Sequence, residues 1–167
     1  MDWNPAEKRF NWELVYCELY AGGKYKNDDG GDYEYSLGLN GLGACATQYA
    51  SEYMDVTVWR DGNKYSLHFA KGKIKGKMLV EPSDRKKTGT TTRWKPDIEV
   101  FTDINIPESY FLDILRRQAV VNAGVTFRFR AQHGAKFETT EFCYKNGIAD
   151  YVAELAGESP LTQPYYI

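Results

Sequence analysis

The stretch from Leu19 to Gly43 places the strongest limit on how this chain can fold. Glycines stand at both ends of the stretch, as Gly22-Gly23 and as Gly41-x-Gly43, and the segment 24–35 between them is rich in Asp, Asn and Gly. Such a segment contributes little to a hydrophobic core, and paired glycines end helices and permit tight turns. The stretch therefore predicts one helix before it, a polar loop, and a second helix that begins at Gly43.

The second glycine group has the features of an anion-binding turn. It reads Ser36-Leu37-Gly38-Leu39-Asn40-Gly41-Leu42-Gly43, and small residues follow it. A helix that begins here offers unpaired backbone N–H groups and the positive end of its dipole, which suits phosphate. The alternative is an ordinary surface loop followed by an ordinary helix.

Hydrophobic periodicity divides the remaining sequence into further elements. Apolar residues at helical spacing predict helices over about 10–20, from an Asn105 cap to about Asn122, and over 148–155. Asn4-Pro5 also suits a helix start. Alternation with a period of two predicts strands, and these are expected at 54–60, 65–69, 78–80, 88–94, 125–129 and 137–144.

These elements define a fold class. Asp61-Gly62 and His133-Gly134 are hairpin signals, and an aromatic fraction of 15% favours sheet. We expect an α+β protein, a two-layer sandwich in which a mixed, mostly antiparallel sheet carries helices on one face.

Composition excludes several classes of function. The net charge of −2 gives no general attraction to nucleic acid or membranes, and no apolar run approaches the ~20 residues of a membrane span. The Gly-Lys-Ser/Thr phosphate loop is absent, and the glycines do not have dinucleotide-binding spacing. With only His68 and His133 present, neither a His-rich metal site nor a Ser-His-Asp triad is expected.

The cysteines and two charged segments leave alternatives open. Cys17, Cys45 and Cys143 are widely separated, which is typical of buried, reduced thiols in a cytoplasmic protein. The acidic loop residues at 28, 29 and 32 are either a hard-cation site or, as we favour, solvated side chains. The segment 71–95 holds nine Lys and Arg. A nucleic-acid patch is one interpretation, but we favour a solvated hairpin face because aromatic interleaving is missing.

Several separated motifs resemble one known family. Leu19-Tyr20-Ala21-Gly22-Gly23-Lys24-Tyr25 and the later segment 36–43 resemble the ATP lid of the B subunits of DNA gyrase and topoisomerase IV. Lys87-Thr88-Gly89-Thr90, with Arg93-Trp94-x-Pro96, is similar to a nucleotide-site strand of that family. Further motifs follow in the family's order, and these are Arg60-Asp61-Gly62, Phe101-Thr102, Leu115-Arg116-Arg117 and Asn122-Ala123-Gly124-Val125. The resemblance covers about residues 10–167.

The resemblance implies a Bergerat-type (GHKL) ATPase fold and a place in a larger enzyme. The implied function is that of an ATP-binding segment in the B subunit of a bacterial type II DNA topoisomerase, which couples ATP to strand passage and supercoiling. The implied partners are the gyrase A subunit, duplex DNA and a second B subunit that dimerises on ATP binding. The implied location is the cytoplasm, with no membrane contact.

The resemblance also implies a set of ATP-binding residues. Lys24 would approach the phosphates, Tyr33 would reach the nucleotide from the lid, Thr90 would lie near the adenine, and Arg60 would lie at the pocket rim. The phosphate cradle would consist of Gly38, Leu39, Asn40, Gly41, Leu42 and Gly43. The alternatives are a solvated loop lysine for Lys24 and a plain strand residue for Thr90.

Two departures from the family limit this expectation. Asn40 stands where the family most often has His, although backbone contacts should survive. Nothing before Leu19 matches the family's catalytic Glu, its magnesium-binding Asn or its adenine-reading Asp.

We therefore expect a partial ATPase domain over 1–158, with 159–167 starting the connection to a transducer domain. We expect no catalytic residue and no ligand for Mg²⁺ in this chain, and hence little or no hydrolysis and at best weak nucleotide binding. The alternative is a non-enzymatic interaction module of the same fold.

Overall fold

A computed structural model describes residues 1–21, 41–158 and 162. The described residues form two compact units, Met1–Ile104 and Asn105–Ile167, here called the first and the second unit. Five of the expected site residues lie outside the described residues, namely Lys24, Tyr33, Gly38, Leu39 and Asn40.

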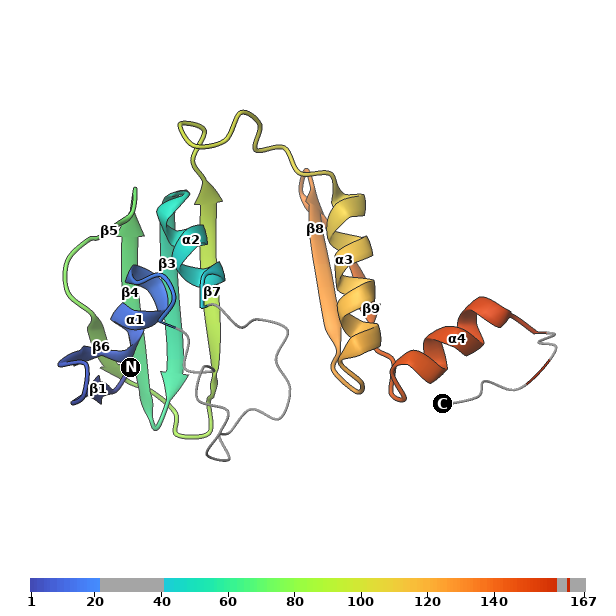
Figure 1. Ribbon diagram of the computed structural model, residues 1–167, viewed down its shortest axis with the longest axis horizontal. Helices are drawn as coiled ribbons and strands as arrows, with labels where there is room; N and C mark the ends of the chain where they lie inside the picture. Colours follow the sequence, from blue (N-terminus) through green and yellow to red (C-terminus); the bar gives the residue numbers. More distant parts are fainter. Residues whose placement is uncertain (22–40, 159–161, 163–167) are drawn as a thin grey trace. The chain divides into compact units, whose positions relative to one another are not determined.

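The first unit is built on an antiparallel sheet (Figure 1). Strand β3 (Ser51–Arg60) lies between β4 (Asn63–Ala70) and β7 (Gly89–Pro96), while β5 (Lys73–Ile74) and β6 (Leu79–Pro82) both pair with β4. The β3–β4 turn contains Asp61 at φ 53° and Gly62 at φ 78°. Two successive positive φ angles are those of a tight hairpin turn whose twist matches the strands, so the predicted hairpin is confirmed.

Two short helices and a small hairpin complete the first unit. Helix α1 (Asn11–Cys17) follows the hairpin of β1 (Trp3–Asn4) and β2 (Arg9–Phe10), and α2 (Gly43–Tyr49) packs on α1 and β3. The core consists of Trp12 from α1 and four strand residues, Met54, Val56, Leu67 and Phe69. The sheet face that carries these side chains is called the inner face below.

Strand register assigns the remaining side chains to the two faces of the sheet. Val58 faces Tyr65 on one neighbouring strand and Thr90 on the other. Because side chains alternate along a strand, Arg60, Thr90, Thr92 and Trp94 share the inner face with Val58. The opposite face, here called the outer face, carries Tyr53, Asp55, Thr57, Trp59, Lys64, Ser66, His68, Thr91, Arg93 and Lys95.

The second unit is a helix packed on a β-hairpin. It contains α3 (Glu108–Val121), β8 (Phe127–His133), β9 (Lys136–Phe142) and α4 (Ile148–Ala156). The Phe111 ring of α3 stacks on Phe129 of β8, with ring centroids 5.8 Å apart and planes inclined by 16°. Ala119, Val120 and Tyr144 are the buried centre of this unit.

The expected α+β class is confirmed, because helices pack on antiparallel strands in both units. Two local expectations are wrong. Asn4 belongs to β1, and its Oδ1 accepts the N–H groups of Ala6 and Glu7, so it caps a turn and starts no helix. Helix α3 begins at Glu108 after Pro107, so Asn105 is not its cap.

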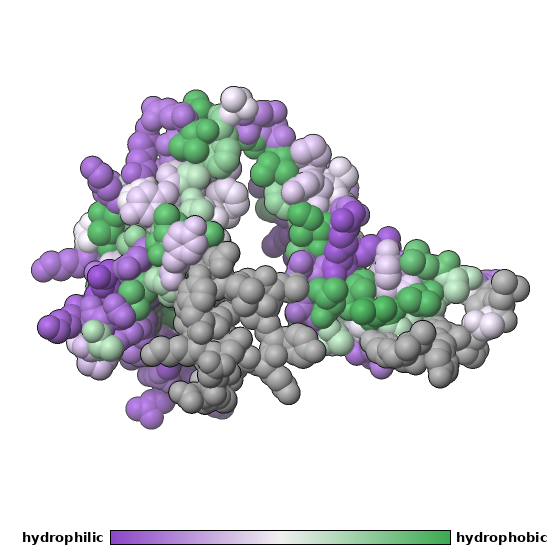
Figure 2. All heavy atoms as spheres, in the orientation of Figure 1, coloured by the Kyte–Doolittle hydropathy of each residue, from purple (hydrophilic) through white to green (hydrophobic). Residues whose placement is uncertain are grey.

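Burial departs from expectation at the cysteines and at α4. Cys45 is buried as expected, whereas Cys17 and Cys143 are exposed. The apolar positions of α4 are also exposed, with fractions of 49% at Ile148 and 68% at Leu155. Figure 2 shows hydrophobic residues gathered over α4 on its visible face. Helical spacing therefore identified the helix, but not what its apolar residues contact.

The start of α4 provides a pH-dependent prediction. Asp150 accepts hydrogen bonds from the backbone N–H and the side-chain amide of Asn146, at 2.8 and 2.9 Å. These bonds, the backbone one first, lower the pKa of the Asp150 carboxyl below its ordinary value of 3.8. Its charged form therefore stabilises the fold above that ordinary value, and the contribution is lost as pH falls through the lowered pKa.

We expect Asp150→Asn to lower the melting temperature at neutral pH. The difference from the wild type should shrink as the pH falls below about 4 and vanish once the carboxyl is protonated. Melting curves followed by circular dichroism over this pH range provide the measurement. A difference that does not change with pH would contradict the role given to the charge.

Candidate functional site

The turn before α2 has the backbone geometry of an anion cradle. Gly41 has φ 61°, in the left-handed region, and Leu42 follows in a helical conformation at φ −96° and ψ −35°. No side chain of the described residues caps the N-terminus of α2. A Cβ added at Gly43 would meet no atom of the described residues within 4 Å. Among these residues, the space beside Gly43 is therefore free for an anion to approach the backbone.

Thr90 and Arg60 lie on the inner face. Thr90 faces Val58 across the β3–β7 pair, and Arg60 follows two residues later on β3. Both are exposed, and Arg60 forms ion pairs with Asp2 at 3.2 Å and Asp61 at 3.1 Å. The sheet therefore brings these two expected residues to one face.

The neighbouring position on β7 is tied to the first helix. The Thr92 hydroxyl lies near the Tyr16 phenol of α1, where it acts on the pKa of that phenol. Burial raises the pKa of Tyr16 above its ordinary value, although the Thr92 hydroxyl acts in the opposite direction. Helix α1 therefore covers the inner face next to Thr90.

Neighbouring elements of the first unit connect the Gly41–Gly43 turn to Arg60 and Thr90. The turn leads into α2, which packs on β3, and β3 pairs with the β7 strand that carries Thr90.

Cys45 in the first turn of α2 is buried. Burial raises the pKa of its thiol, and the nearby Glu18 carboxylate raises it further. A thiol with a raised pKa is a poor nucleophile, so Cys45 is a packing residue.

Sequence reasoning missed Gln48. This α2 residue is 1% exposed, and both amide atoms of its side chain have no hydrogen-bond partner within the described residues. A buried polar group without a partner costs about 1–3 kcal/mol. The position of Gln48 on a helix rich in small residues is enough to predict that its side chain is buried. No sequence signal indicates that the buried amide has no hydrogen-bond partner.

We expect Gln48→Met to stabilise the chain by about 1 kcal/mol, because it keeps the volume and removes the unpaired amide. Urea unfolding followed by tryptophan fluorescence measures the change. Gln48→Glu is the matched comparison and should destabilise, since it buries a charge in the same place. A loss of stability in the Met variant would show that the amide has a partner.

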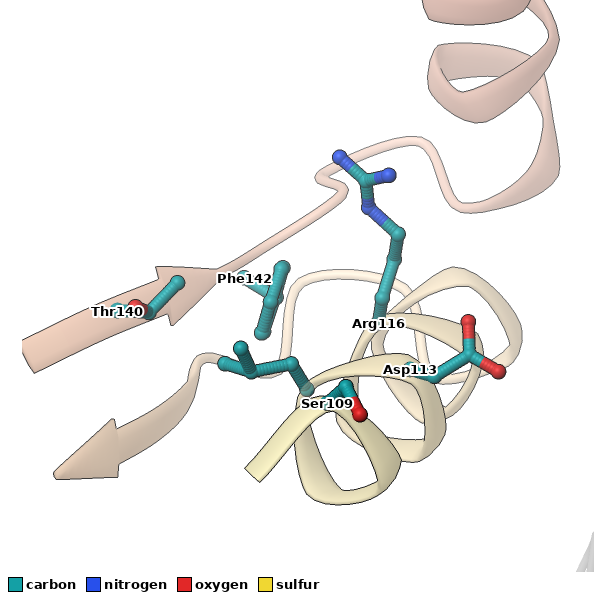
Figure 3. Close-up of a pocket in the computed structure, with 6 residues that line it drawn as sticks. Ser109, Asp113, Arg116, Thr140 and Phe142 are labelled. Carbon is teal, nitrogen blue, oxygen red and sulfur yellow. The ribbon is translucent and has the colours of Figure 1, made fainter. Parts of the chain in front are cut away.

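The second unit contains a separate cavity of about 340 Å³. Figure 3 shows Asp113 and Arg116 projecting from α3, and Thr140 and Phe142 coming from β9. Ser109 and Leu112 complete the lining. None of the expected site residues lines this cavity.

The charges at this cavity already have partners. Arg116 donates to Glu154 at 3.0 Å, and Asp113 accepts from Arg117 at 2.8 Å. The Tyr144 hydroxyl donates to the second oxygen of Glu154 at 2.7 Å. Burial, followed by that hydrogen bond, raises the pKa of Tyr144. This network ties α4 to α3 and is best explained as structural.

The described residues contain no group of three or more His, Cys, Asp and Glu side chains that could hold a metal ion. None of the described helices is long and apolar enough to cross a membrane.

Comparison with known proteins identifies the class. No protein-family model matches the chain. Among solved structures, the 43K ATPase domain of Thermus thermophilus gyrase B, in complex with an aminocoumarin, aligns with a TM-score of 0.72 and 27% identity. The alignment covers 93% of this chain and 37% of that chain. The fold is therefore that of a gyrase-type ATPase domain, as the motif resemblance implied.

Curated relatives show which proteins of this class the chain resembles in sequence. The B subunit of DNA topoisomerase 4 from Salmonella typhimurium is 31% identical over 161 residues, which cover 96% of this chain and 25% of the relative. The DNA gyrase B subunit of Thermus thermophilus is 32% identical over 169 residues, which cover 100% of this chain and 26% of the relative. The chain is homologous to a segment of the B subunits of DNA gyrase and topoisomerase IV. It spans about a quarter of their length.

Proposed function

We propose that the chain is an ATP-binding segment of the B subunit of a bacterial type II DNA topoisomerase. The observation that carries this proposal is the similarity, in fold and sequence, to the gyrase B ATPase domain over 93% of the chain. In the whole protein the partners would be the A subunit, duplex DNA and a second B subunit that dimerises on ATP binding. The place of action would be the cytoplasm.

The described geometry fits a nucleotide phosphate at the start of α2. Gly41 holds a positive φ, and none of the described residues fills the space beside Gly43, so phosphate oxygens could approach the backbone N–H groups of this turn. Thr90 would contact the adenine from the inner face, and Arg60 would stand at the rim. The remaining ATP contacts would come from residues outside the described part, namely Lys24, Tyr33, Gly38, Leu39 and Asn40.

We further propose that the chain binds ATP without hydrolysing it. The two carboxylates of the first helix region are engaged in local structure, since Glu13 accepts the backbone N–H of Phe10 at 2.7 Å and Glu18 pairs with Arg9. We therefore assign neither of them as a general base for water. Mg²⁺ would offset the charge of the ATP phosphates, and we assign it no ligand among the residues of this chain. Residues 1–158 would act as one part of the ATPase domain.

Titration with a non-hydrolysable ATP analogue tests the binding proposal. Trp94 lies on the inner face, four residues after Thr90 on the same strand, so its fluorescence should report binding. We expect a saturable change that ATP also produces and that Trp94→Phe reduces. The absence of any saturable change would favour the non-enzymatic interaction module.

An ATPase assay tests the proposed lack of hydrolysis independently of the binding measurement. We expect no turnover above the buffer background in the presence of Mg²⁺. Magnesium-dependent turnover that Glu13→Gln or Glu18→Gln removes would contradict the argument and identify the base.

A further inference from the structure

The outer face of the sheet carries two cations stacked on aromatic rings. The guanidinium carbon of Arg93 lies 5.6 Å from the centroid of the Tyr53 ring, and the Lys87 ammonium lies 4.1 Å from the centroid of Trp59. Tyr53 and Trp59 come from β3, whereas Arg93 belongs to β7 and Lys87 precedes it. Strand pairing therefore brings two aromatic neighbours from outside the basic segment onto its cations.

These two cations differ from the lysines of the same face, which form ion pairs with carboxylates. Lys95 pairs with Glu52, and Lys64 pairs with Glu81 at 2.8 Å. His68 lies 2.5 Å from Asp55. Within the described residues, no ion pair engages Arg93 or Lys87, although the Asp55 carboxylate lies opposite Arg93 across the β3–β7 pair and His68 beside it is charged only when protonated. Stacking on a ring holds a cation in place without neutralising it.

The position of the two pairs fits an extended polyanion. Tyr53 and Trp59 are six residues apart on one strand, which corresponds to about 20 Å. Both lie on the polar outer face, whereas the core helix α1 packs against the inner face. In a duplex the bases are stacked on one another, so aromatic rings on an open sheet face cannot stack on them. Basic groups and aromatic rings spread over an open sheet are typical of single-strand binding, in which bases stack and phosphates meet cations.

We propose that the outer face binds single-stranded nucleic acid, with Arg93 and Lys87 moving from the Tyr53 and Trp59 rings to phosphates and the uncovered rings then stacking on bases. The inference does not rest on the proposed nucleotide site, because Thr90 and Arg60 lie on the inner face. The solvated-face interpretation of the basic segment is the alternative that the experiment must exclude.

Fluorescence polarisation of a labelled oligothymidylate, without nucleotide, tests the proposal on the full chain. We expect salt-dependent binding that Arg93→Gln and Lys87→Gln each weaken about threefold to tenfold, with the slope against log salt falling by about 0.7 per cation. Arg93→Lys, which keeps the charge, should retain the slope. Arg130→Gln is the matched control, because Arg130 stacks on Phe137 at 4.1 Å in the second unit and lies on no such face.

Three outcomes would overturn the proposal. These are no binding by the wild-type chain at about 50 mM salt, an equal loss in the Arg130→Gln control, and tighter binding of a duplex of the same length. Unchanged circular dichroism spectra of the variants ensure that a loss reflects the surface. Titration with the ATP analogue is a separate measurement, so either proposal can fail without the other.

Discussion

Gly41→Val is expected to reduce binding of a non-hydrolysable ATP analogue below detection. Gly41 adopts φ 61°, a conformation that costs an ordinary residue about 1–2 kcal/mol and a β-branched residue more. Valine would therefore drive the turn towards a negative φ and redirect the N–H groups that follow it. Analogue titration followed by Trp94 fluorescence measures the loss, which should be about a hundredfold or greater.

Two companion variants separate the backbone effect from a general loss of folding. Gly41→Asn should retain part of the affinity, because Asn tolerates the left-handed region. Gly43→Ala meets no steric conflict in the described residues and replaces a helical glycine, so it should stabilise the chain by up to about 1 kcal/mol. The new methyl group would nevertheless occupy the space proposed for phosphate. Weaker binding together with higher stability would locate the ligand at this turn, whereas wild-type affinity in Gly41→Val would refute it.

The parts of the fold that sequence predicted correctly depend on local signals. Met54 and Val56 alternate with polar residues over a full strand, and Asp61-Gly62 requires the backbone of a tight hairpin. Both signals lie within a few residues, so they hold in any tertiary context. The cap predicted at Asn105 failed because the residue type fits several turn structures, and Pro107 moved the helix start to Glu108.

Features that depend on residues far apart in sequence were not predictable. The exposure of Cys17 and Cys143 is set by tertiary packing, which cysteine spacing does not encode. The aromatic partners of Arg93 and Lys87 are about thirty to forty residues away on β3, so inspection of the basic segment alone gave the wrong impression of a face without aromatics. Only the strand register reveals them.

The candidate site also has some features that the sequence predicted and some that it did not. Motif order predicted Thr90 and Arg60 as members of one site, and the register places both on the inner face. The ion pairs of Arg60 with Asp2 and Asp61 were not predictable, because Asp2 lies in a terminal segment without a motif. The nucleotide roles of these residues remain predictions for the titration to test.

Phe69→Ala is expected to have the largest effect on stability. Phe69 is 1% exposed, and its ring contacts Trp12 and Tyr16 of α1, with centroid distances of 6.2 and 5.8 Å. Truncation removes this buried area and leaves a cavity between helix and sheet, at a cost of about 3–5 kcal/mol. Because domains of this kind are stable by about 5–15 kcal/mol, the variant should be partly unfolded at moderate temperature.

Urea unfolding of the variants, followed by tryptophan fluorescence, measures the predicted cost. Phe69→Leu should cost roughly half as much, since it keeps most of the volume. Ile98→Ala is the control within the same unit, because Ile98 is 68% exposed, and it should change stability by less than about 0.5 kcal/mol. A cost below about 1 kcal/mol for Phe69→Ala would mean that α1 is not held on the sheet by this cluster.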